Sequence, residues 1–102
     1  MVRPNIDISM DRIGEFCRRW KIRELSLFGS VLREDFRPDS DVDVLVSFQP
    51  DDPWDLFDLG QMRDELMDMF GREVDMIEEE GLRNPFRRRT IMDTREVIYH
   101  AS

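Results

Sequence analysis

Two short apolar runs, joined by a connection of fixed length, constrain the fold of this chain most strongly. The first run, residues 25–28, ends at the pair Gly29-Ser30, and ten residues separate this pair from Asp41-Val42-Asp43. The second run, residues 44–48, follows directly. Short apolar runs bounded by glycine or polar residues are typical of buried strands. The pattern therefore predicts two strands, with a glycine turn after the first and two carboxylates at the start of the second.

The two carboxylates are spaced for a shared ligand. Side chains at positions i and i+2 of a strand point to the same face, so Asp41 and Asp43 are predicted to lie side by side. Two ionised carboxylates at this spacing repel each other unless a cation lies between them. Mg²⁺ takes oxygen ligands and is usually held by one or two carboxylates together with substrate phosphates. An acidic strand start that faces solvent has the same composition, so the pair by itself leaves both interpretations open.

The Gly29-Ser30 turn suits a phosphate group. Glycine has no Cβ, so the backbone can approach a ligand closely. Residues 31–33 can begin a helix, and free N–H groups at a helix start bind anions. Ser30 would then cap this helix or donate its hydroxyl hydrogen to a phosphate oxygen. An ordinary strand-turn-helix junction also contains Gly-Ser, and only the fixed distance to Asp41 and Asp43 favours the phosphate interpretation.

Gly-Ser, ten residues and Asp-x-Asp form the signature of the polymerase-β-like nucleotidyltransferases, and this chain resembles that family. Residues 28–33 and 40–44 resemble its small stand-alone members, the minimal nucleotidyltransferases. The resemblance implies a polymerase-β-like nucleotidyltransferase fold of the α/β (α+β) class, with a mixed sheet flanked by helices. It also implies a third carboxylate on a later strand, which Asp75 supplies between Val74 and Met76.

The resemblance further implies transfer of a nucleotide from ATP with the help of two Mg²⁺ ions. The implied catalytic and metal-binding residues are Asp41, Asp43 and Asp75, and the implied nucleotide-binding residues are Gly29, Ser30 and Arg33. Minimal nucleotidyltransferases of this kind resemble antitoxins that transfer AMP to a tyrosine of a HEPN-domain ribonuclease toxin, so such a toxin is the expected partner. Two other functions stay open, a small-molecule nucleotidyltransferase and a non-enzymatic antitoxin that acts by binding alone.

Asp75 has a second argument in its favour. A strand over residues 73–77 places Asp75 on the same face as Ile77, so this face is expected to be at least partly buried. A buried carboxylate without a partner is costly. A metal ion, or a role in deprotonating the attacking hydroxyl group, would remove that cost.

Length and charge narrow the class of protein. The 102 residues have room for one domain, residues 1–102. Proteins that bind nucleic acids usually carry a basic surface, whereas this chain has a net charge of −8. No direct nucleic-acid binding is therefore expected. The acidic charge fits a protein that docks a basic partner.

The cysteine content and the absence of long apolar runs bear on the cellular compartment. The single cysteine, Cys17, excludes an internal disulfide and is expected in the core, which favours a reducing compartment. The sequence has no signal peptide and no apolar run near 18 residues, which predicts a cytoplasmic protein without a membrane partner.

The arginines concentrate in two places. Arg33 and Arg37 bracket the connection between the glycine turn and the carboxylates, where a phosphate-binding role and a solvated loop are both open. A second cluster lies near the end of the chain, at Arg83, Arg87, Arg88 and Arg89. This cluster is either a solvated helix face or a surface that meets an acidic partner.

Periodicity and capping residues predict the order α-β-α-β-α-β-α-β. The first helix is capped by Ser9, and its apolar face consists of Met10, Ile13, Cys17 and Trp20. The next long helix covers residues 53–70, with Asp52 as N-cap, Pro53 at the first position and Gly71 at its end. Strands are predicted at residues 24–29, 42–48, 73–77 and 96–99, and a last helix begins at Asn84-Pro85.

Overall fold

The computed structural model describes residues 8–33, 37, 40–50 and 54–101. The helices are α1 (Met10–Arg19), α2 (Leu56–Phe70) and α3 (Pro85–Thr94), with two short 3-10 helices, η1 (Gly29–Leu32) and η2 (Glu79–Gly81). The strands are β1 (Ile22–Phe28), β2 (Val42–Phe48), β3 (Val74–Glu78) and β4 (Glu96–His100). None of the helices in the described ranges is both long and apolar enough to cross a membrane.

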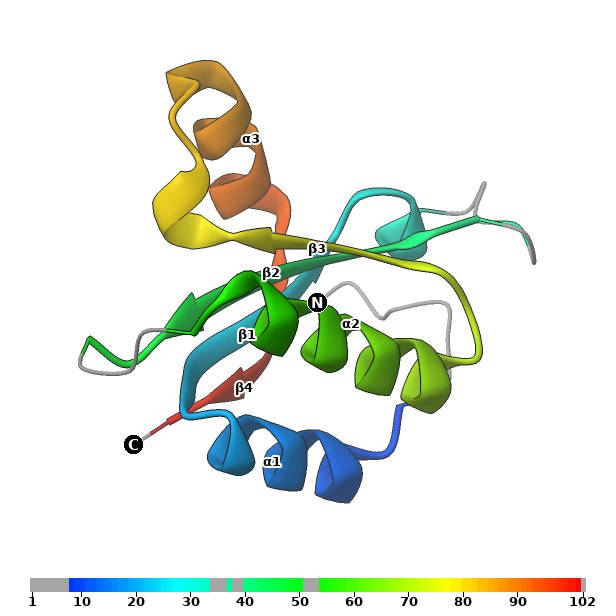
Figure 1. The fold of residues 1–102 in the computed structure, drawn as a ribbon. Coiled ribbons are helices and arrows are strands. Elements are labelled where there is room, and N and C mark those ends of the chain that lie inside the picture. Colours follow the sequence, from blue (N-terminus) through cyan, green and yellow to red (C-terminus); the bar gives the residue numbers. More distant parts are fainter. Residues whose placement is uncertain (1–7, 34–36, 38–39, 51–53, 102) are drawn as a thin grey trace.

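The strands form one sheet in the order β3-β2-β1-β4 (Figure 1). β1 lies antiparallel to β2 and β4, whereas β2 and β3 are parallel. Parallel neighbours need a crossover connection, and α2 supplies it between β2 and β3. The predicted mixed sheet is confirmed, and the strand boundaries differ from the predicted ones by at most two residues.

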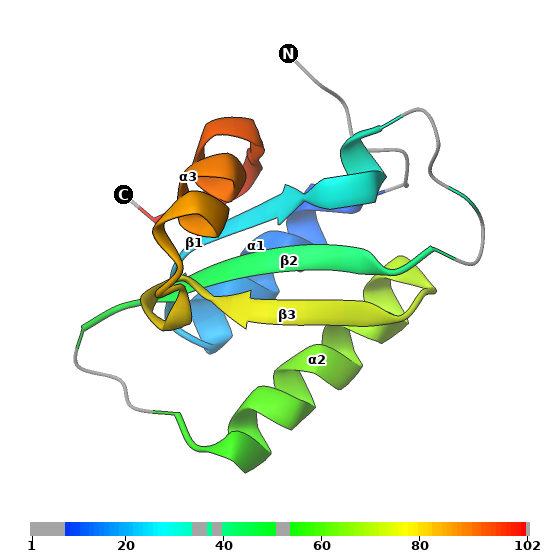
Figure 2. The same cartoon turned by 90° about the horizontal axis from the view of Figure 1, so that it is seen from above.

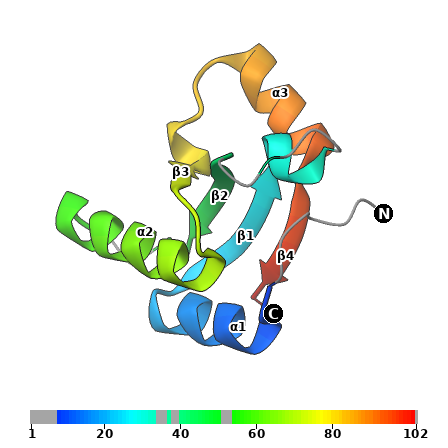
Figure 3. The same ribbon diagram turned by 90° about the vertical axis from the view of Figure 1, so that its right-hand side faces the viewer.

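Helices cover both faces of the sheet. Figures 2 and 3 show α1 and α2 on one face and α3 on the other. The larger hydrophobic core lies under α1 and α2 and includes Val44 of β2. The smaller core lies between the sheet and α3, and its buried members are Phe28, Leu45, Leu82 and Ile91. Successive residues of β2 belong to different cores because the side chains of a strand alternate between its two faces.

α1 is capped as predicted. The Ser9 hydroxyl oxygen accepts a hydrogen bond from the Arg12 backbone N–H at 3.4 Å. Most of the predicted apolar face is buried, namely Ile13, Cys17 and Trp20. Met10 is 54% exposed, because it is the first residue of the helix and lies beyond the edge of the core.

α2 begins at Leu56 instead of residue 53. Its N-cap is Asp55, whose carboxylate accepts a hydrogen bond from the Asp58 N–H at 2.8 Å. The Asp58 carboxylate in turn accepts one from the Asp55 N–H at 3.2 Å. This capping box satisfies two N–H groups and sets the start of the helix. The predicted cap, Asp52-Pro53, lies outside the described residues. Gly71 ends the helix as predicted, in a left-handed conformation with a φ of 67°.

The 3-10 helix η1 replaces the helix predicted to start at residues 31–33. Its N-cap is Phe28 rather than Ser30, and no side chain caps it. Arg33 already returns to an extended backbone, with φ −112° and ψ 158°. Since Asp43 pairs with Phe28 across the sheet, the connection has to turn back toward β2, which leaves little room for a longer helix.

Candidate functional site

The predicted carboxylates and the glycine turn lie at one end of the sheet. β2 and β3 pair in parallel, and their register places Asp43 directly opposite Asp75. On its other side Asp43 pairs with Phe28, the last residue of β1, and Gly29 follows Phe28. Asp41 is exposed and directly precedes the first residue of β2. The fold therefore brings together residues that are far apart in the sequence.

Gly29 lies against Asp43. Its φ of +76° is a left-handed conformation that residues with a Cβ rarely adopt. A Cβ at this position would collide with the Asp43 carboxylate oxygen Oδ2 and lie 3.3 Å from the Asp43 Cγ. Glycine is thus favoured for two independent reasons, the conformation of the turn and the space beside the carboxylate.

Burial and like charges raise the pKa of the half-buried Asp43 carboxyl above its ordinary value. Burial is the largest cause, followed by the negative charges of Asp75 and Asp41. The positive charges of Arg33 and Arg87 act in the opposite direction without cancelling the increase. A bound cation would favour the ionised carboxyl as these arginines do. The end of the sheet is therefore electrostatically suited to a cation.

The donor chemistry of this end of the sheet fits Mg²⁺. Across the described ranges, no three Asp, Glu, His or Cys side chains are arranged as a preformed metal cage. Mg²⁺ rarely uses such a cage, since it is usually bound by one or two carboxylates together with substrate phosphates. Asp43 and Asp75, which lie opposite each other on neighbouring strands, match that mode of binding.

Asp75 is exposed, which corrects the expectation that its face of β3 is buried at this position. β3 is an outer strand of the sheet. The smaller core under α3 extends along this face only as far as Ile77. The cost of an unpaired buried carboxylate therefore does not apply to Asp75, and its carboxylate is accessible to an incoming molecule.

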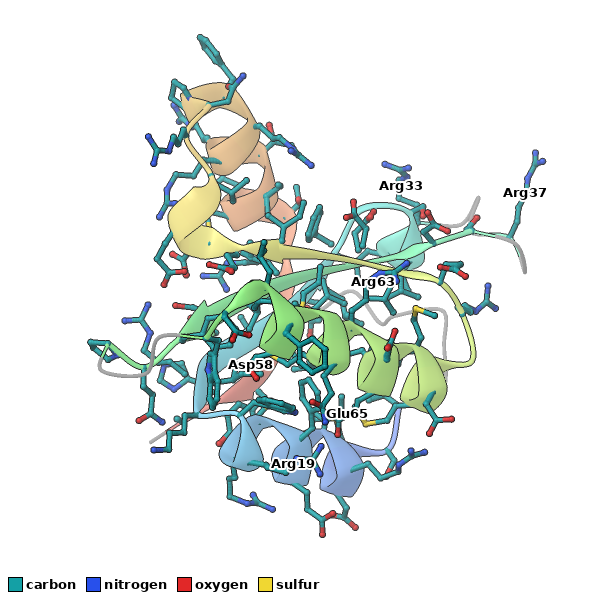
Figure 4. The ribbon with its side chains drawn as sticks, viewed as in Figure 1. Arg19, Arg33, Arg37, Asp58, Arg63 and Glu65 are labelled. Carbon is teal, nitrogen blue, oxygen red and sulfur yellow. The ribbon has the colours of Figure 1, made fainter. Side chains whose placement is uncertain are left out.

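Ser30 and Arg33 belong to the turn itself. Ser30 is half-buried, and its backbone carbonyl accepts a hydrogen bond from the Arg33 N–H at 2.9 Å. Figure 4 shows the exposed Arg33 side chain projecting from the turn on the side of the sheet that carries α3. Arg37, in contrast, extends away from the turn in the same view.

A groove of about 320 Å³ separates the turn from α3. Its first wall consists of Phe28, Gly29, Leu32 and Arg33. Its second wall consists of Thr90, Ile91 and Thr94. The residues of the second wall are absent from the predicted site, although their spacing is that of one helix face.

A larger cavity, of about 400 Å³, lies between α1 and α2 on the opposite face of the sheet. Arg19 and Glu65, which form an ion pair, are among the residues that line it (Figure 4). It is lined by none of the residues predicted for the site, so the smaller groove beside Gly29 is the one that bears on the candidate chemistry.

The mixed sheet, with a glycine turn and acidic residues at one end, has the architecture expected of a nucleotidyltransferase. The sequence matches the family described as "Nucleotidyltransferase domain" over residues 11–98. The chain belongs to this family, and the predicted family and fold class are confirmed.

Individual relatives agree with this assignment. The chain is 32% identical over 85 residues to "Protein adenylyltransferase MntA" of Thermococcus cleftensis. The aligned region covers 83% of this chain and 81% of the relative. A solved structure of a "putative minimal nucleotidyltransferase" is 30% identical, with a TM-score of 0.70 over 85% of this chain and 86% of that one. A solved "toxin-antitoxin with AMP-PNP" has a TM-score of 0.72 over 93% of this chain and 76% of that one. Because the sequence identity to this last structure is only 16%, the similarity shows a shared fold and nothing more.

Proposed function

We propose that this protein is an antitoxin that transfers AMP from ATP to a tyrosine hydroxyl of a HEPN-domain ribonuclease toxin, in a Mg²⁺-dependent reaction. The observation that carries the proposal is the contact of Gly29 with Asp43, which has Asp75 opposite it on the neighbouring strand. The relative from Thermococcus cleftensis is named a protein adenylyltransferase. A third solved structure with this fold is the "toxin-antitoxin MntA-HepT", with a TM-score of 0.63 at 16% identity.

The residues at this end of the sheet have two roles, phosphate binding and metal binding. The backbone N–H groups of Gly29 and Ser30 bind the β- and γ-phosphates of ATP as hydrogen-bond donors. The missing Cβ of Gly29 leaves room for the Asp43 carboxylate against the same turn. Asp41, Asp43 and Asp75 are the residues that would hold Mg²⁺. When bound there, Mg²⁺ stabilises negative charge on the attacking and leaving oxygens.

The transfer itself is a substitution at the α-phosphorus of ATP. The acceptor hydroxyl oxygen forms a bond to this phosphorus, and the bond from the phosphorus to the oxygen that bridges to the β-phosphate breaks. Pyrophosphate leaves with the bonding electron pair. Asp75, which is exposed, takes the proton from the attacking hydroxyl group.

The charge of the chain supports a protein acceptor. The net charge of −8 favours association with a basic protein, and a ribonuclease needs basic surface to bind RNA. Cytoplasmic localisation, without direct binding to nucleic acid or membranes, belongs to the same proposal.

Intact-mass spectrometry of the toxin tests the proposal. The purified chain is incubated with ATP, Mg²⁺ and the product of the neighbouring gene, which is expected to be the HEPN-domain toxin. We expect the toxin to gain the mass of one or more AMP groups, located on tyrosine by peptide sequencing. Asp43→Asn, which keeps the size of the side chain but removes its charge, should abolish the mass gain. A tight complex with unmodified toxin would overturn the proposal in favour of an antitoxin that acts by binding alone. If the chain modifies a small molecule in the absence of the toxin, the protein is a small-molecule nucleotidyltransferase and the proposed protein acceptor is wrong.

A further inference from the structure

Arg87 lies on the groove-facing side of α3. Thr90 and Ile91 line the groove between α3 and the Gly29-Ser30 turn. Residues three and four apart are neighbours on one side of a helix, and Arg87 precedes these two residues by three and four positions. Its side chain therefore starts one turn of α3 beyond the lined part of the groove.

The other two arginines of this run have partners. Arg88 donates from Nη1 to the Glu79 backbone carbonyl at 3.0 Å and from Nη2 to Glu79 Oε1 at 3.2 Å, which fixes η2 to α3. The Arg89 Nε lies 3.8 Å from Asp93 Oδ2, one turn further along the same helix. Within the described part of the chain, the guanidinium group of Arg87 has no comparable ion pair.

The charge of Arg87 acts on the carboxylate at the end of the sheet. Arg33, on the turn, and Arg87, on α3, are the two positive groups close enough to the Asp43 carboxylate for their charges to act on it. Arg33 lines the groove on the side of the turn, and Arg87 lies one helical turn beyond the residues of α3 that line the other side. A positive group is therefore present on each side of the groove. Asp41, Asp43 and Asp75 lie at the same end of the sheet and would repel a free triphosphate. A nucleotide bound beside these carboxylates needs positive charge from the protein as well as from a metal ion.

We propose that Arg87 binds the phosphate groups of the nucleotide from the α3 wall of the groove, opposite the Gly29-Ser30 turn. A guanidinium group presents N–H donors in a planar fork that matches two phosphate oxygens, and such charged hydrogen bonds are among the strongest in proteins. Arg87 thereby makes α3 part of the nucleotide site in addition to its packing against the sheet. The inference rests on the proposed nucleotide chemistry and adds a substrate-binding residue to it.

The test compares Arg87→Ala with Arg89→Ala, a matched removal of one exposed arginine from the same helix. Equilibrium binding of a non-hydrolysable ATP analogue is measured by calorimetry, with and without Mg²⁺. We expect Arg87→Ala to weaken binding roughly ten- to hundredfold and Arg89→Ala to leave it unchanged. Arg87→Lys should recover part of the affinity, because lysine keeps the charge and lacks the fork. In the transfer assay, Arg87→Ala should raise the KM for ATP by a similar factor.

Two results separate the inference from the proposed function. If the wild-type chain modifies the toxin while Arg87→Ala binds the analogue as tightly as the wild type does, the role of Arg87 is refuted and the proposed function stands. If no acceptor is modified but Arg87→Ala still weakens analogue binding, the role of Arg87 stands and the proposed transfer fails. Circular dichroism establishes that the variants are folded, and Arg87→Gln replaces Arg87→Ala if the alanine variant is not. Equal loss of binding in Arg87→Ala and Arg89→Ala would reduce the effect to general surface charge and overturn the inference.

Discussion

Replacing Gly29 by alanine measures how closely the turn lies against Asp43. A residue with a Cβ loses about 1–2 kcal/mol in a left-handed backbone conformation. A methyl group forced into occupied space typically costs about 1–3 kcal/mol more. Because Gly29 meets both conditions, we expect Gly29→Ala to lower the free energy of unfolding by about 2–5 kcal/mol.

Gly71→Ala is the matched control. Gly71 also has a positive φ, of +67°, but a Cβ there would meet no atom within 4 Å. Its substitution should therefore cost only the conformational part, about 1–2 kcal/mol. The difference between the two variants reports the collision with the carboxylate.

Urea denaturation, followed by the fluorescence of Trp20 and Trp54, gives both free energies of unfolding. A double-mutant cycle with Asp43→Ala isolates the contact, because removal of the carboxylate gives the new methyl group room. We expect the cost of Gly29→Ala to fall toward that of Gly71→Ala in the Asp43→Ala background. Equal costs for the two glycine variants, or no coupling in the cycle, would refute the close contact between Gly29 and Asp43.

Three further predictions concern charge and packing around the site. The raised pKa of Asp43 in the folded protein means that the stability of the metal-free wild type should fall as the pH rises from the unfolded-state pKa of this carboxyl to its folded-state pKa. Asp43→Asn should be more stable than the wild type near neutral pH and lose this advantage below the unfolded-state pKa; an equal difference at every pH, measured by urea denaturation, would contradict this. Ile91→Ala opens a cavity between the sheet and α3 and should cost about 2–4 kcal/mol in the same assay; a cost below about 1 kcal/mol would mean that α3 packs only loosely. Glu24 Oε1 accepts a hydrogen bond from Arg95 Nη1 at 2.6 Å with both side chains largely buried, so Glu24→Gln should cost about 1–3 kcal/mol; a neutral result would show that the pair contributes little to stability.

The strands and the family were predictable because their signals are local. The apolar run of β2 lies between two groups of polar residues, and its predicted bounds, residues 42–48, agree with the structure. Ser9, Asn84 and Gly71 act at helix ends through contacts with residues nearby in the sequence, so their roles follow from residue type. The pattern of Gly29-Ser30 followed by Asp41-Val42-Asp43 is equally local, and it was sufficient to indicate the family.

The errors arose where the position of the chain depends on partners distant in sequence. Asp52 and Asp55 are both residues that cap helices, and the reciprocal bond of Asp55 with Asp58 decides between them. The exposure of Asp75 depends on the place of β3 at the edge of the sheet, which strand periodicity does not contain. The role proposed for Arg87 depends on the position of α3 beside the Gly29-Ser30 turn, which brings together residues far apart in the sequence.

The central claim is that the chain transfers the AMP part of ATP to a partner protein. The most direct measurement uses ATP with a radioactive label in either the α- or the γ-phosphate, incubated with Mg²⁺, the chain and the HEPN-domain toxin. The account predicts that the toxin acquires the α-phosphate label from the wild-type chain, acquires no γ-phosphate label, and acquires neither label from Asp43→Asn. A toxin labelled from the γ-phosphate would mean phosphoryl transfer, and a stable complex without either label would mean inhibition by binding; each result contradicts the account.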